Sequence, residues 1–342
     1  MSRAGPRPRV SAVVLAYQAE PWLPHAVRAL LRSRDVDTEV VLVDNGCTTS
    51  DVAMLAGLPG VVVVRPGVNL GFAGGCNAGA AIASGDYIAL VNSDCVVDPW
   101  ALGRLVHAVG EAGVGVAVGS VRLADDPSLI NAGANPIHVL GLSWCGRFGR
   151  PEDRVEPFDT LGGSGACMLT TAAHWKRLEG FYQEYFAYHE DAELSVRTWR
   201  MGARVVCVPN AVAVHRYEFS RNPLKLYLIE RNRLMLLATL WSVRALVLLA
   251  PALLALEAAM LLLAVKQGWA REKVRGWAWL WRHRAALRRR RQVLAAELAT
   301  PDRHWMAMLT PRLEQAGFGL PAGVGLANLL MRGYWRLVRP LI

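Results

Sequence analysis

The chain has 342 residues, of which 53% are hydrophobic and 19% are charged, so it is too apolar for a disordered protein and long enough for one large or two modest domains. Its formal net charge of +10 is uneven, because residues 1–265 hold 23 basic and 24 acidic residues whereas residues 266–342 hold 15 and 4. A basic tail on a neutral body predicts a surface-binding appendage and excludes a uniformly basic enzyme.

The first apolar run, residues 10–17, is short and is followed by Gln18-Ala19-Glu20. This is typical of a first strand and not of a secretory signal. The six cysteines are widely separated, with neither a Cys-x-x-Cys pair nor the spacing of a zinc site. We therefore expect reduced thiols in a cytoplasmic protein.

Strands and helices alternate along the first hundred residues. Val, Ile and Leu runs bounded by Gly, Pro and Asn predict buried strands at residues 10–17, 39–44, 61–65 and 87–92. Apolar spacing and small residues predict helices over residues 24–34 and 77–84. This order predicts a doubly wound, mostly parallel α/β sheet, with ligands bound at the carboxyl ends of the strands.

Residues 114–214 are less regular. Short strands are predicted at residues 116–121, 166–170 and 205–208, among loops rich in Gly and Pro, and one acidic helix is predicted over residues 189–201. We expect residues 1–113 to form the nucleotide-binding half of a catalytic domain over residues 1–232, with the acceptor half at 114–232. A helical region would follow at residues 233–342.

Three polar motifs follow predicted strands. Asp44-Asn45-Gly46 closes the second strand, where a carboxylate accepts hydrogen bonds from a base or ribose; Asp-Asn-Gly is equally a good turn. Residues 69–79 (NLGFAGGCNAG) form a glycine-rich turn that opens a helix, which suits close approach to a phosphate or ribose. The spacing fits neither the dinucleotide fingerprint nor the P-loop.

The third motif, Asn92-Ser93-Asp94, comes directly after the strand YIALV. A carboxylate at this position is well placed to hold a divalent cation that neutralises a diphosphate. A structural cap at the end of the strand is the alternative interpretation.

Together these motifs resemble a family 2 nucleotide-sugar glycosyltransferase of the GT-A fold, specifically the bacterial rhamnosyltransferases of cell-envelope glycan assembly. The resemblance implies a dTDP- or UDP-sugar donor and a divalent cation, Mg²⁺ or Mn²⁺. The family motif is usually Asp-x-Asp, and Asn92 replaces its first carboxylate, which leaves Asp94 as the implied ligand. The implied donor-binding residues are Ala16, Tyr17, Asp44, Asn45, Asn69, Gly71, Phe72, Gly75, Asn77, Asn92, Ser93 and Asp94.

The resemblance continues in residues 186–197 (FAYHEDAELSVR), where Asp191 matches the catalytic base and Glu190 is placed on the acceptor side. Inversion in a direct displacement needs one carboxylate to take the acceptor proton. An acidic first helical turn is the structural alternative. Glu193 and Arg197, four residues apart, are expected to form a surface ion pair.

Three further features complete the predicted site. His215 follows a short strand and matches a second metal ligand, although a histidine there could equally serve the fold. Gly163, Ser164 and Gly165 suit an acceptor-binding wall or an ordinary turn. The Gln-x-x-Arg-Trp signature of processive synthases is absent, and Arg231 lies in Glu230-Arg231-Asn232-Arg233 near its place, on the predicted acceptor side, which implies transfer of a single sugar.

Residues 245–265 are long enough, at about 31 Å as a helix, to cross a bilayer. Two observations argue against a simple span. Pro251 and Glu257 lie inside this segment, and a single crossing would export the basic residues Arg288–Arg291. A hairpin of residues 234–250 and 252–265, or two interfacial helices, keeps both ends inside. Seven of the twelve tryptophans lie beyond residue 240, which is typical of helices on an anionic leaflet. A soluble helical subdomain or dimer interface is the alternative.

The sequence thus predicts an inverting, metal-dependent glycosyltransferase at the cytoplasmic face of the membrane. It would move one sugar, with rhamnose from dTDP-rhamnose as the first guess, to a lipid-linked acceptor in cell-surface polysaccharide synthesis. A polyprenyl-phosphate sugar transferase and an inactive scaffold of a glycan-assembly complex are the alternatives. We expect an anionic membrane surface as a partner, possible homo-oligomers and no nucleic acid.

Overall fold

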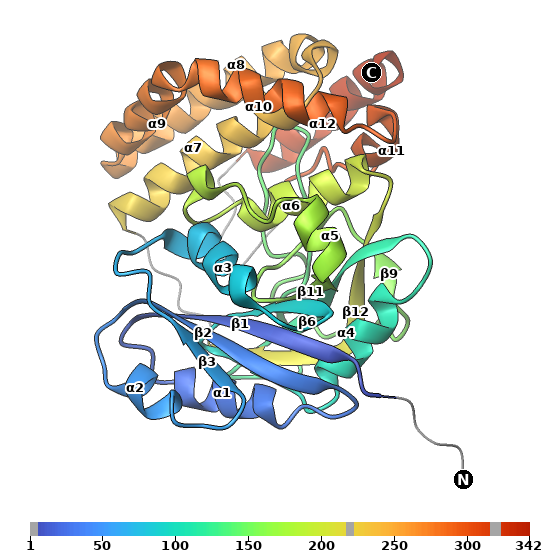
Figure 1. Ribbon diagram of the computed structural model, residues 1–342. Coiled ribbons are helices and arrows are strands. Elements are labelled where there is room, and N and C mark those ends of the chain that lie inside the picture. Colours follow the sequence, from blue (N-terminus) through green and yellow to red (C-terminus); the bar gives the residue numbers. More distant parts are fainter. Residues whose placement is uncertain (1–5, 217–221, 315–322) are drawn as a thin grey trace.

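The structure is a computed structural model that describes residues 6–216, 222–314 and 323–342. A twisted β-sheet with helices on both faces occupies one half of the molecule, and the C-terminal helices form a layer over the other half (Figure 1). The N-terminal strand lies near the middle of the sheet, and the helical layer is the last part of the chain.

The main sheet has the order β3-β2-β1-β4-β11-β6-β12-β5. Four neighbouring strands run parallel, namely β3 (Val61–Val64), β2 (Asp37–Cys47), β1 (Arg9–Gln18) and β4 (Tyr87–Val91). Antiparallel β11 (Cys167–Thr171) lies between β4 and β6 (Val114–Leu123), and β12 (Arg204–His215) runs parallel to β6. Antiparallel β5 (Cys95–Val97) lies beside β12. The predicted α/β sheet is confirmed, with β11 and β5 making it mixed.

Short strands extend the sheet in the part of the chain after β6. β7 (Ile130–Ala132) pairs with β6, β9 (Phe158–Asp159) pairs with β12, and β8 (Ala134–Asn135) pairs with β10 (Gly162–Gly163) in a separate ribbon. These strands carry the loops that surround the predicted acceptor side.

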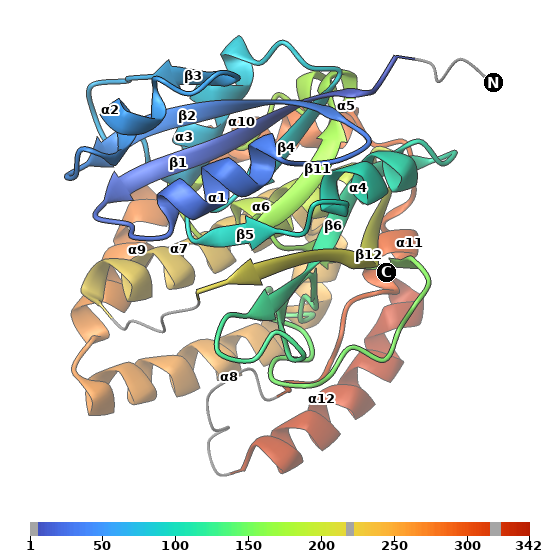
Figure 2. The same cartoon turned by 90° about the horizontal axis from the view of Figure 1, so that it is seen from below.

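Alternating side chains of β1 separate two apolar layers. Val10, Ala12 and Val14 pack with α1 (Leu23–Leu31), α2 (Asp51–Leu55) and α4 (Ala101–Val109), whereas Val13 and Leu15 pack with α3 (Gly71–Ile82), α5 (Ala172–Arg177) and α6 (Glu190–Arg200). Figure 2 shows α1 and α4 on one face of the sheet. Helices on both faces explain why the strands are apolar runs without alternation. A short 3₁₀ turn, η1 (Gln183–Tyr185), precedes α6.

The C-terminal region is helical, as predicted, but it is not a separate unit. It comprises α7 (Pro223–Leu240), α8 (Val243–Gln267), α9 (Ala270–Arg282), α10 (Arg284–Ala296), α11 (Asp302–Met306), α12 (Val324–Val338) and the 3₁₀ turn η2 (Arg339–Leu341). The predicted boundary between residues 232 and 233 falls inside α7. Met235 of α7 and Leu287 of α10 belong to the same apolar cluster as the strands, so the two regions share a core.

The break between the two long apolar helices lies at residues 241–242, so the predicted break at Pro251 was wrong. Trp241 is fully buried against Trp305, with ring centroids 5.1 Å apart, and its indole N–H donates to Val139 O. Ser242 Oγ then caps α8 by accepting from Ala245 N at 3.2 Å. Pro251 lies inside α8 on its exposed side, where its missing N–H costs one helical hydrogen bond.

Within the described residues, α8 is long and apolar enough by length and composition to cross a membrane. It packs one side on the protein, because Ala245, Leu249 and Ala264 are buried, and most of its remaining surface is exposed. The helix therefore lies along the molecule and does not project from it (Figure 1).

Candidate active site

Many of the predicted site residues lie at one edge of the sheet, where the parallel strands end. Residues 164–166 join the two key motifs there: Asn92 N donates to Ala166 O at 3.1 Å, and Gly165 N donates to Asp191 Oδ2 at 3.1 Å. Because Gly165 and Ala166 are adjacent, the segment Asn92-Ser93-Asp94 and the first turn of α6 meet at one edge of the sheet.

His215, at the end of β12, lies beside Asp94, with 3.0 Å between Nε2 and Oδ1. The strand register brings them together, because His215 is opposite Cys95. Asn92 Nδ2 is 3.5 Å from the same ring nitrogen, and Asn131 Oδ1 is 2.8 Å from Nδ1 on the other side of the ring. The two residues predicted to bind metal are therefore adjacent.

The Asp94–His215 pair fits a divalent cation. Asn131 Oδ1 accepts a hydrogen bond, so a neutral His215 ring carries its proton on Nδ1 and turns a lone pair on Nε2 toward the Asp94 carboxylate. Two acceptors 3.0 Å apart are stabilised by a shared cation or proton. No group of three His, Cys, Asp or Glu residues suited to a metal occurs in the described ranges, so phosphate or water oxygens would supply the other ligands.

Asp191 stands in the first turn of α6, half-buried. Gly165 N donates to Oδ2, and Ala192 N donates to Oδ1 at 2.7 Å. Burial raises the pKa of Asp191 above its ordinary value, although the two backbone amides act in the opposite direction. A carboxylate with a raised pKa is a better proton acceptor, which is the property that a catalytic base requires.

Glu190 is buried, and its Oε2 has no hydrogen-bond partner among the described residues. Burial raises its pKa well above the ordinary range, and the neighbouring Asp191 carboxylate adds to the effect. Glu190 therefore lies inside the protein, in surroundings that favour its protonated form. Its place on the acceptor side stays a prediction.

The loop before α6 has an unusual backbone. Phe186, Tyr188 and His189 have φ values of 61°, 70° and 69°, a region that costs side chains other than glycine of order 1 kcal/mol or more each. Ala73 N of α3 donates to Phe186 O at 3.0 Å. The glycine at 71, with φ +69°, is required here, because a Cβ atom would lie 2.4 Å from Phe186 O.

Helix α7 holds the same loop from the other side. Asn232 Nδ2 lies within hydrogen-bonding distance of the carbonyl oxygens of Tyr185, Ala187 and Tyr188, at 2.9, 2.8 and 2.6 Å. Arg231 Nη2 donates to Tyr185 O at 2.9 Å, and its guanidinium lies over Trp279. The structure thus gives Arg231, predicted on the acceptor side, a buried position behind the loop that leads to Asp191.

Two predicted donor residues shape the glycine-rich turn. Asn45 Nδ2 donates to Asn69 Oδ1 at 3.1 Å and to Gly71 O at 3.2 Å, while Leu70 N donates to Asn45 Oδ1 at 2.9 Å. A Cβ at Gly75 would lie 2.5 Å from Leu15 Cδ2, so this glycine lets α3 pack closely on β1. These residues therefore set the position of the helix N-terminus.

Asn77 lies away from the strand ends. Its Nδ2 donates to Phe181 O at 2.8 Å and its Oδ1 accepts from Phe181 N at 2.9 Å, so both ends of the side chain bind one backbone residue. The structure does not bring Asn77 together with Asp94 or Asp191. The sequence did not predict that Asn77 binds the backbone of Phe181, because the two residues are 104 positions apart.

The remaining donor residues lie at the ends of β1 and β2, in α3 and after β4. Ala16 is fully buried, so only its backbone can reach a ligand, whereas Tyr17 is exposed and its ring packs beside Gly46. Asp44 Oδ1 accepts from Cys47 N at 3.1 Å, and Oδ2 lies 3.9 Å from Arg65 Nε. Ser93 and Phe72 are half-buried.

The loop at residues 163–165 has two parts. Gly163 and Ser164 are buried, and Gly163 N donates to Ser195 Oγ at 3.1 Å, so they belong to the interior. Gly165 carries the contact with Asp191, and a Cβ there would lie 3.2 Å from the Phe72 ring. Of the three predicted acceptor-wall residues, Gly165 is the one in contact with the predicted base.

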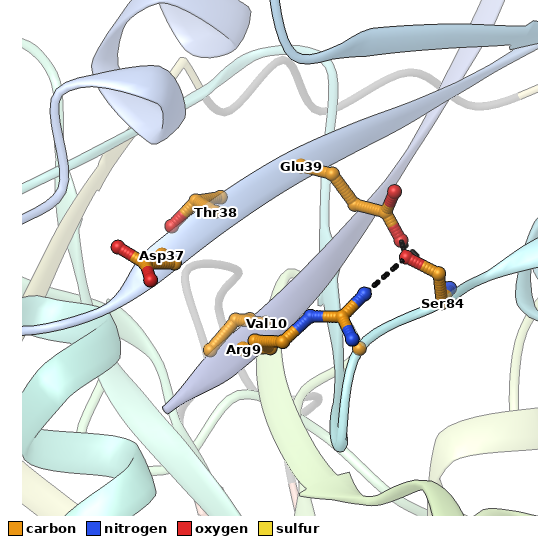
Figure 3. Close-up of a pocket in the computed structure, with 7 residues that line it drawn as sticks. Arg9, Val10, Asp37, Thr38, Glu39 and Ser84 are labelled. Atoms are coloured by element: carbon orange, nitrogen blue, oxygen red, sulfur yellow. Dashed lines mark hydrogen bonds between the residues drawn. The ribbon is translucent and has the colours of Figure 1, made fainter. Parts of the chain in front are cut away.

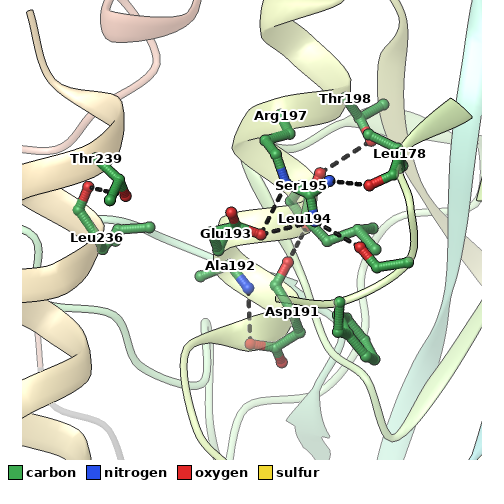
Figure 4. A network of polar contacts seen from close by, with 12 residues as sticks. Leu178, Asp191, Ala192, Glu193, Leu194, Ser195, Arg197, Thr198, Leu236 and Thr239 are labelled. Carbon is green, nitrogen blue, oxygen red and sulfur yellow. Dashed lines mark hydrogen bonds and ion pairs between the residues drawn. The ribbon is translucent and has the colours of Figure 1, made fainter. Parts of the chain in front are cut away.

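The expected surface pair of Glu193 and Arg197 is a buried network (Figure 4). Glu193 is fully buried; Arg197 Nη2 lies 2.8 Å from its Oε2 and Arg290 Nη2 lies 2.5 Å from its Oε1. Arg197 also donates to Gly180 O at 2.7 Å. Burial alone would raise the pKa of Glu193, but the two arginines hold it below its ordinary value. The prediction failed because α10, far along the chain, covers this face.

Sequence reasoning missed three positioning residues, namely Asn131, Asn232 and Arg290. Asn232 stands in a motif that the sequence singled out, but nothing local marks Asn131 or Arg290.

A cavity of about 220 Å³ lies at the opposite edge of the sheet, at the amino ends of β1 and β2, and no predicted site residue lines it. Arg9, Glu39 and Ser84 form hydrogen bonds there (Figure 3).

Comparisons with known proteins agree with this geometry. Residues 11–177 match the family described as glycosyl transferase family 2. N-acetylglucosaminyl-diphospho-decaprenol L-rhamnosyltransferase of Mycobacterium tuberculosis is 26% identical over 230 residues, which cover 59% of this chain and 74% of the relative. Succinoglycan biosynthesis protein ExoO of Rhizobium meliloti is 34% identical over 113 residues, 32% of either chain.

Two solved structures share the fold. GalNAc-T7 with UDP, GalNAc and Mn²⁺ is 15% identical with a TM-score of 0.58, covering 70% of this chain; this chain spans about half of that protein, 49%. The mannosyltransferase PcManGT from Pyrobaculum calidifontis, in complex with GDP-Man and Mn²⁺, is 17% identical with a TM-score of 0.50, covering 80% of this chain and 86% of that one. Residues 11–177 therefore form a glycosyltransferase family 2 domain with the GT-A fold, and the chain resembles the bacterial rhamnosyltransferases.

Proposed function

We propose that this transferase is an inverting enzyme that moves one sugar from a nucleoside-diphosphate donor to a hydroxyl group of a lipid-linked acceptor. The proposal rests on the position of Asp191. Its half-buried carboxylate accepts a hydrogen bond from the Gly165 amide, and the segment that contains Gly165 also binds Asn92. One carboxylate and one cation site at the same edge are the groups that a single displacement needs.

Asp94 and His215 would hold the divalent cation, Mg²⁺ or Mn²⁺, with Asn131 fixing the imidazole ring. The bound cation would neutralise the charge of the departing nucleoside diphosphate. Mn²⁺ in the two structures of the same fold supports this assignment.

Asp191 would take the proton of the acceptor hydroxyl. The acceptor oxygen forms a bond to the anomeric carbon, the bond from that carbon to the diphosphate oxygen breaks, and the nucleoside diphosphate leaves with the electron pair. The raised pKa of Asp191 supports this role. Donor contacts are proposed for the Ala16 backbone, Tyr17, Asp44, Phe72, Asn92 and Ser93, on a turn shaped by Asn45, Asn69, Gly71 and Gly75.

Rhamnose from dTDP-rhamnose is the proposed donor sugar, and a lipid-linked glycan is the proposed acceptor, because the M. tuberculosis relative is a rhamnosyltransferase of N-acetylglucosaminyl-diphospho-decaprenol. A lipid acceptor requires a place at the membrane. We place the enzyme at the cytoplasmic face. The exposed apolar side of α8 supports an interfacial position there, and the packing of Ala245, Leu249 and Ala264 on the protein argues against a span.

Replacement of Asp191 by Asn tests the proposal. We expect turnover with dTDP-rhamnose and a polyprenyl-diphosphate acceptor to fall about 10²–10⁴-fold while donor binding, measured by calorimetry, persists. Asp125→Asn, at an exposed position, is the matched control and should leave both unchanged. Near-normal turnover of Asp191→Asn would point to a phosphate acceptor, and absence of donor binding by the wild-type chain with every nucleotide sugar would point to a scaffold.

A further inference from the structure

Helix α12 carries an apolar stripe that faces away from the protein. Leu326, Leu330 and Leu337 follow helical spacing along one side, and they are 63%, 64% and 74% exposed. Trp335 and Val338, on the opposite side, are buried. This helix is therefore apolar on both sides, and only one of them is covered by the described residues.

Helix α8 carries a second stripe of the same kind. Val243, Val247, Leu254, Leu262 and Val265 are exposed and fall on one side of the helix, without a charged residue in the row. The two helices are in contact, because Tyr334 of α12 donates to Leu248 O of α8. Both lie at the margin of the molecule that is farthest from β2 and β3 (Figures 1 and 2).

A cavity of about 690 Å³ opens between the start of α8, α11 and the end of α12. Arg244, Arg303, Arg336 and Arg339 line it, and no carboxylate side chain does. Within the described ranges, these four arginines have no side-chain hydrogen bond or ion pair. Buried Met306 and Trp335 also line the cavity, which therefore combines apolar and cationic groups.

We propose that this cavity binds the phosphodiester headgroup of an anionic phospholipid while the stripes of α8 and α12 rest among the acyl chains. This inference rests on the membrane position proposed above and assigns the residues that recognise the bilayer. Four unpaired guanidinium groups beside exposed apolar helices complement a phosphate beside a hydrocarbon layer.

The cavity is distinct from the donor site. Helix α7 contacts the loop before Asp191 through Asn232, in its middle, and ends at Leu240, just before Arg244. Because α8 starts only after α7 ends, the arginine cavity lies at the far end of α7 from its contact with the Asp191 loop. The residues that line the cavity include none of the predicted donor, metal or acceptor residues, so the arginine cavity and the donor site are separate.

The test is cosedimentation of the full chain with vesicles of phosphatidylcholine alone and of an equimolar mixture with phosphatidylglycerol. The pocket variant replaces Arg244, Arg303, Arg336 and Arg339 by Gln; the control replaces the exposed Arg271, Arg282, Arg288 and Arg289 by Gln and loses the same charge. We expect the pocket variant to bind the anionic vesicles at least about ten-fold more weakly than the control. A Leu330→Ser/Leu337→Ser variant should weaken binding to both vesicle types.

If the pocket variant and the control variant lose affinity for anionic vesicles equally, the inference is overturned, because the attraction to the membrane would then depend on total charge and not on the cavity. Titration of the wild-type protein with inorganic phosphate, without vesicles, tests whether the cavity binds free phosphate instead. If the wild type binds phosphate and the pocket variant still binds vesicles as the wild type does, the ligand is not a lipid headgroup. A stable dimer that the leucine variant dissociates would assign the stripes to a second copy and overturn the inference. Donor binding, measured in parallel, reports separately on the glycosyltransferase assignment.

Discussion

Arg290 of α10 reaches Glu193 of α6, with 2.5 Å between Nη2 and Oε1, and so ties the C-terminal layer to the helix that carries Asp191 in its first turn. Arg197 occupies the other carboxylate oxygen of Glu193 at 2.8 Å. Arg290 also lies over the ring of Tyr182, with 3.7 Å to its centroid. The basic region therefore supports the helix of the proposed catalytic base as well as forming a surface.

Replacement of Arg290 by Met should lower the free energy of unfolding by about 2 kcal/mol, because a charged hydrogen bond to a fully buried carboxylate is lost. Urea denaturation at neutral pH measures the change. Arg288→Met on the same helix, at an exposed position, is the control and should change stability by less than about 0.5 kcal/mol. Equal effects of the two substitutions would mean that the contact with Glu193 contributes nothing.

The sequence predicted the strands well because their signal is local. Continuous apolar runs identified β1, β2, β3 and β4 to within a few residues, and the motifs at their ends lie at one edge of the sheet. The start of α3 was placed six residues late, because Gly71 enters the helix from a left-handed conformation that no periodicity reveals.

The errors share one physical cause, which is contact between residues far apart in the chain. Glu193 is predicted at the surface but α10 covers it, and the sequence gives no sign that the Asn77 amide binds the backbone of Phe181. The pairing of Asp94 with His215 was expected from family resemblance, whereas Asn131 behind the ring had no signal in the sequence.

Asn131 should control metal affinity through His215. Asn131→Leu removes the acceptor that fixes the imidazole ring, and we expect Mn²⁺ to bind about 10–100-fold more weakly in the presence of a nucleoside diphosphate. Asn131→Asp keeps an acceptor oxygen and should retain most of the affinity. Competitive titration of Mn²⁺ checks both variants, and equal affinities of the Leu variant and the wild type would contradict the positioning role.

The pH dependence of transfer should follow Asp191. Because burial raises its pKa, kcat/KM should fall as pH decreases through a value above the ordinary range of aspartate, since the protonated base cannot accept a proton. Burial favours the protonated form of Glu190, so the neutral replacement Glu190→Gln should retain this acid limb and most of the activity. Loss of activity in Glu190→Gln as large as in Asp191→Asn would mean that a charged Glu190 is needed.

Glu257 interrupts the apolar sequence of α8 because it belongs to a buried network. Its Oε2 lies 3.0 Å from Lys273 Nζ and 2.8 Å from the Trp277 indole nitrogen, and its Oε1 pairs with Arg233. Burial alone would raise the pKa of Glu257, but Arg233 and Lys273 hold it below the ordinary value.

Glu257→Leu should therefore destabilise the protein by about 3 kcal/mol, because a fully buried lysine and arginine lose a shared partner. Denaturant unfolding at neutral pH provides the comparison, with Glu297→Leu at an exposed position as the control. If Glu257→Leu is as stable as the wild type, the network is not a constraint on the position of α8.

Two buried histidines, His138 and His189, and the half-buried His174 should make the protein lose stability in mild acid. Burial lowers the pKa of His138, His174 and His189 to about 4 each, against an ordinary value of 6.5. Between these values the unfolded chain binds more protons than the folded one, so each histidine adds up to about 1.4 kcal/mol of stability per pH unit as pH rises. The buried Asp191 and Glu190, whose pKa values are raised, act in the opposite direction.

A single-site difference isolates the histidine effect from that of the carboxylates. His174→Gln keeps a polar partner for Thr198, whose Oγ1 is 3.3 Å from the ring, but removes one titrating group. The free energy of unfolding of the wild type should therefore fall more than that of His174→Gln between pH 6.5 and pH 5, by about 1–2 kcal/mol. Parallel pH dependences of the two proteins would show that His174 is protonated equally in the folded and unfolded states.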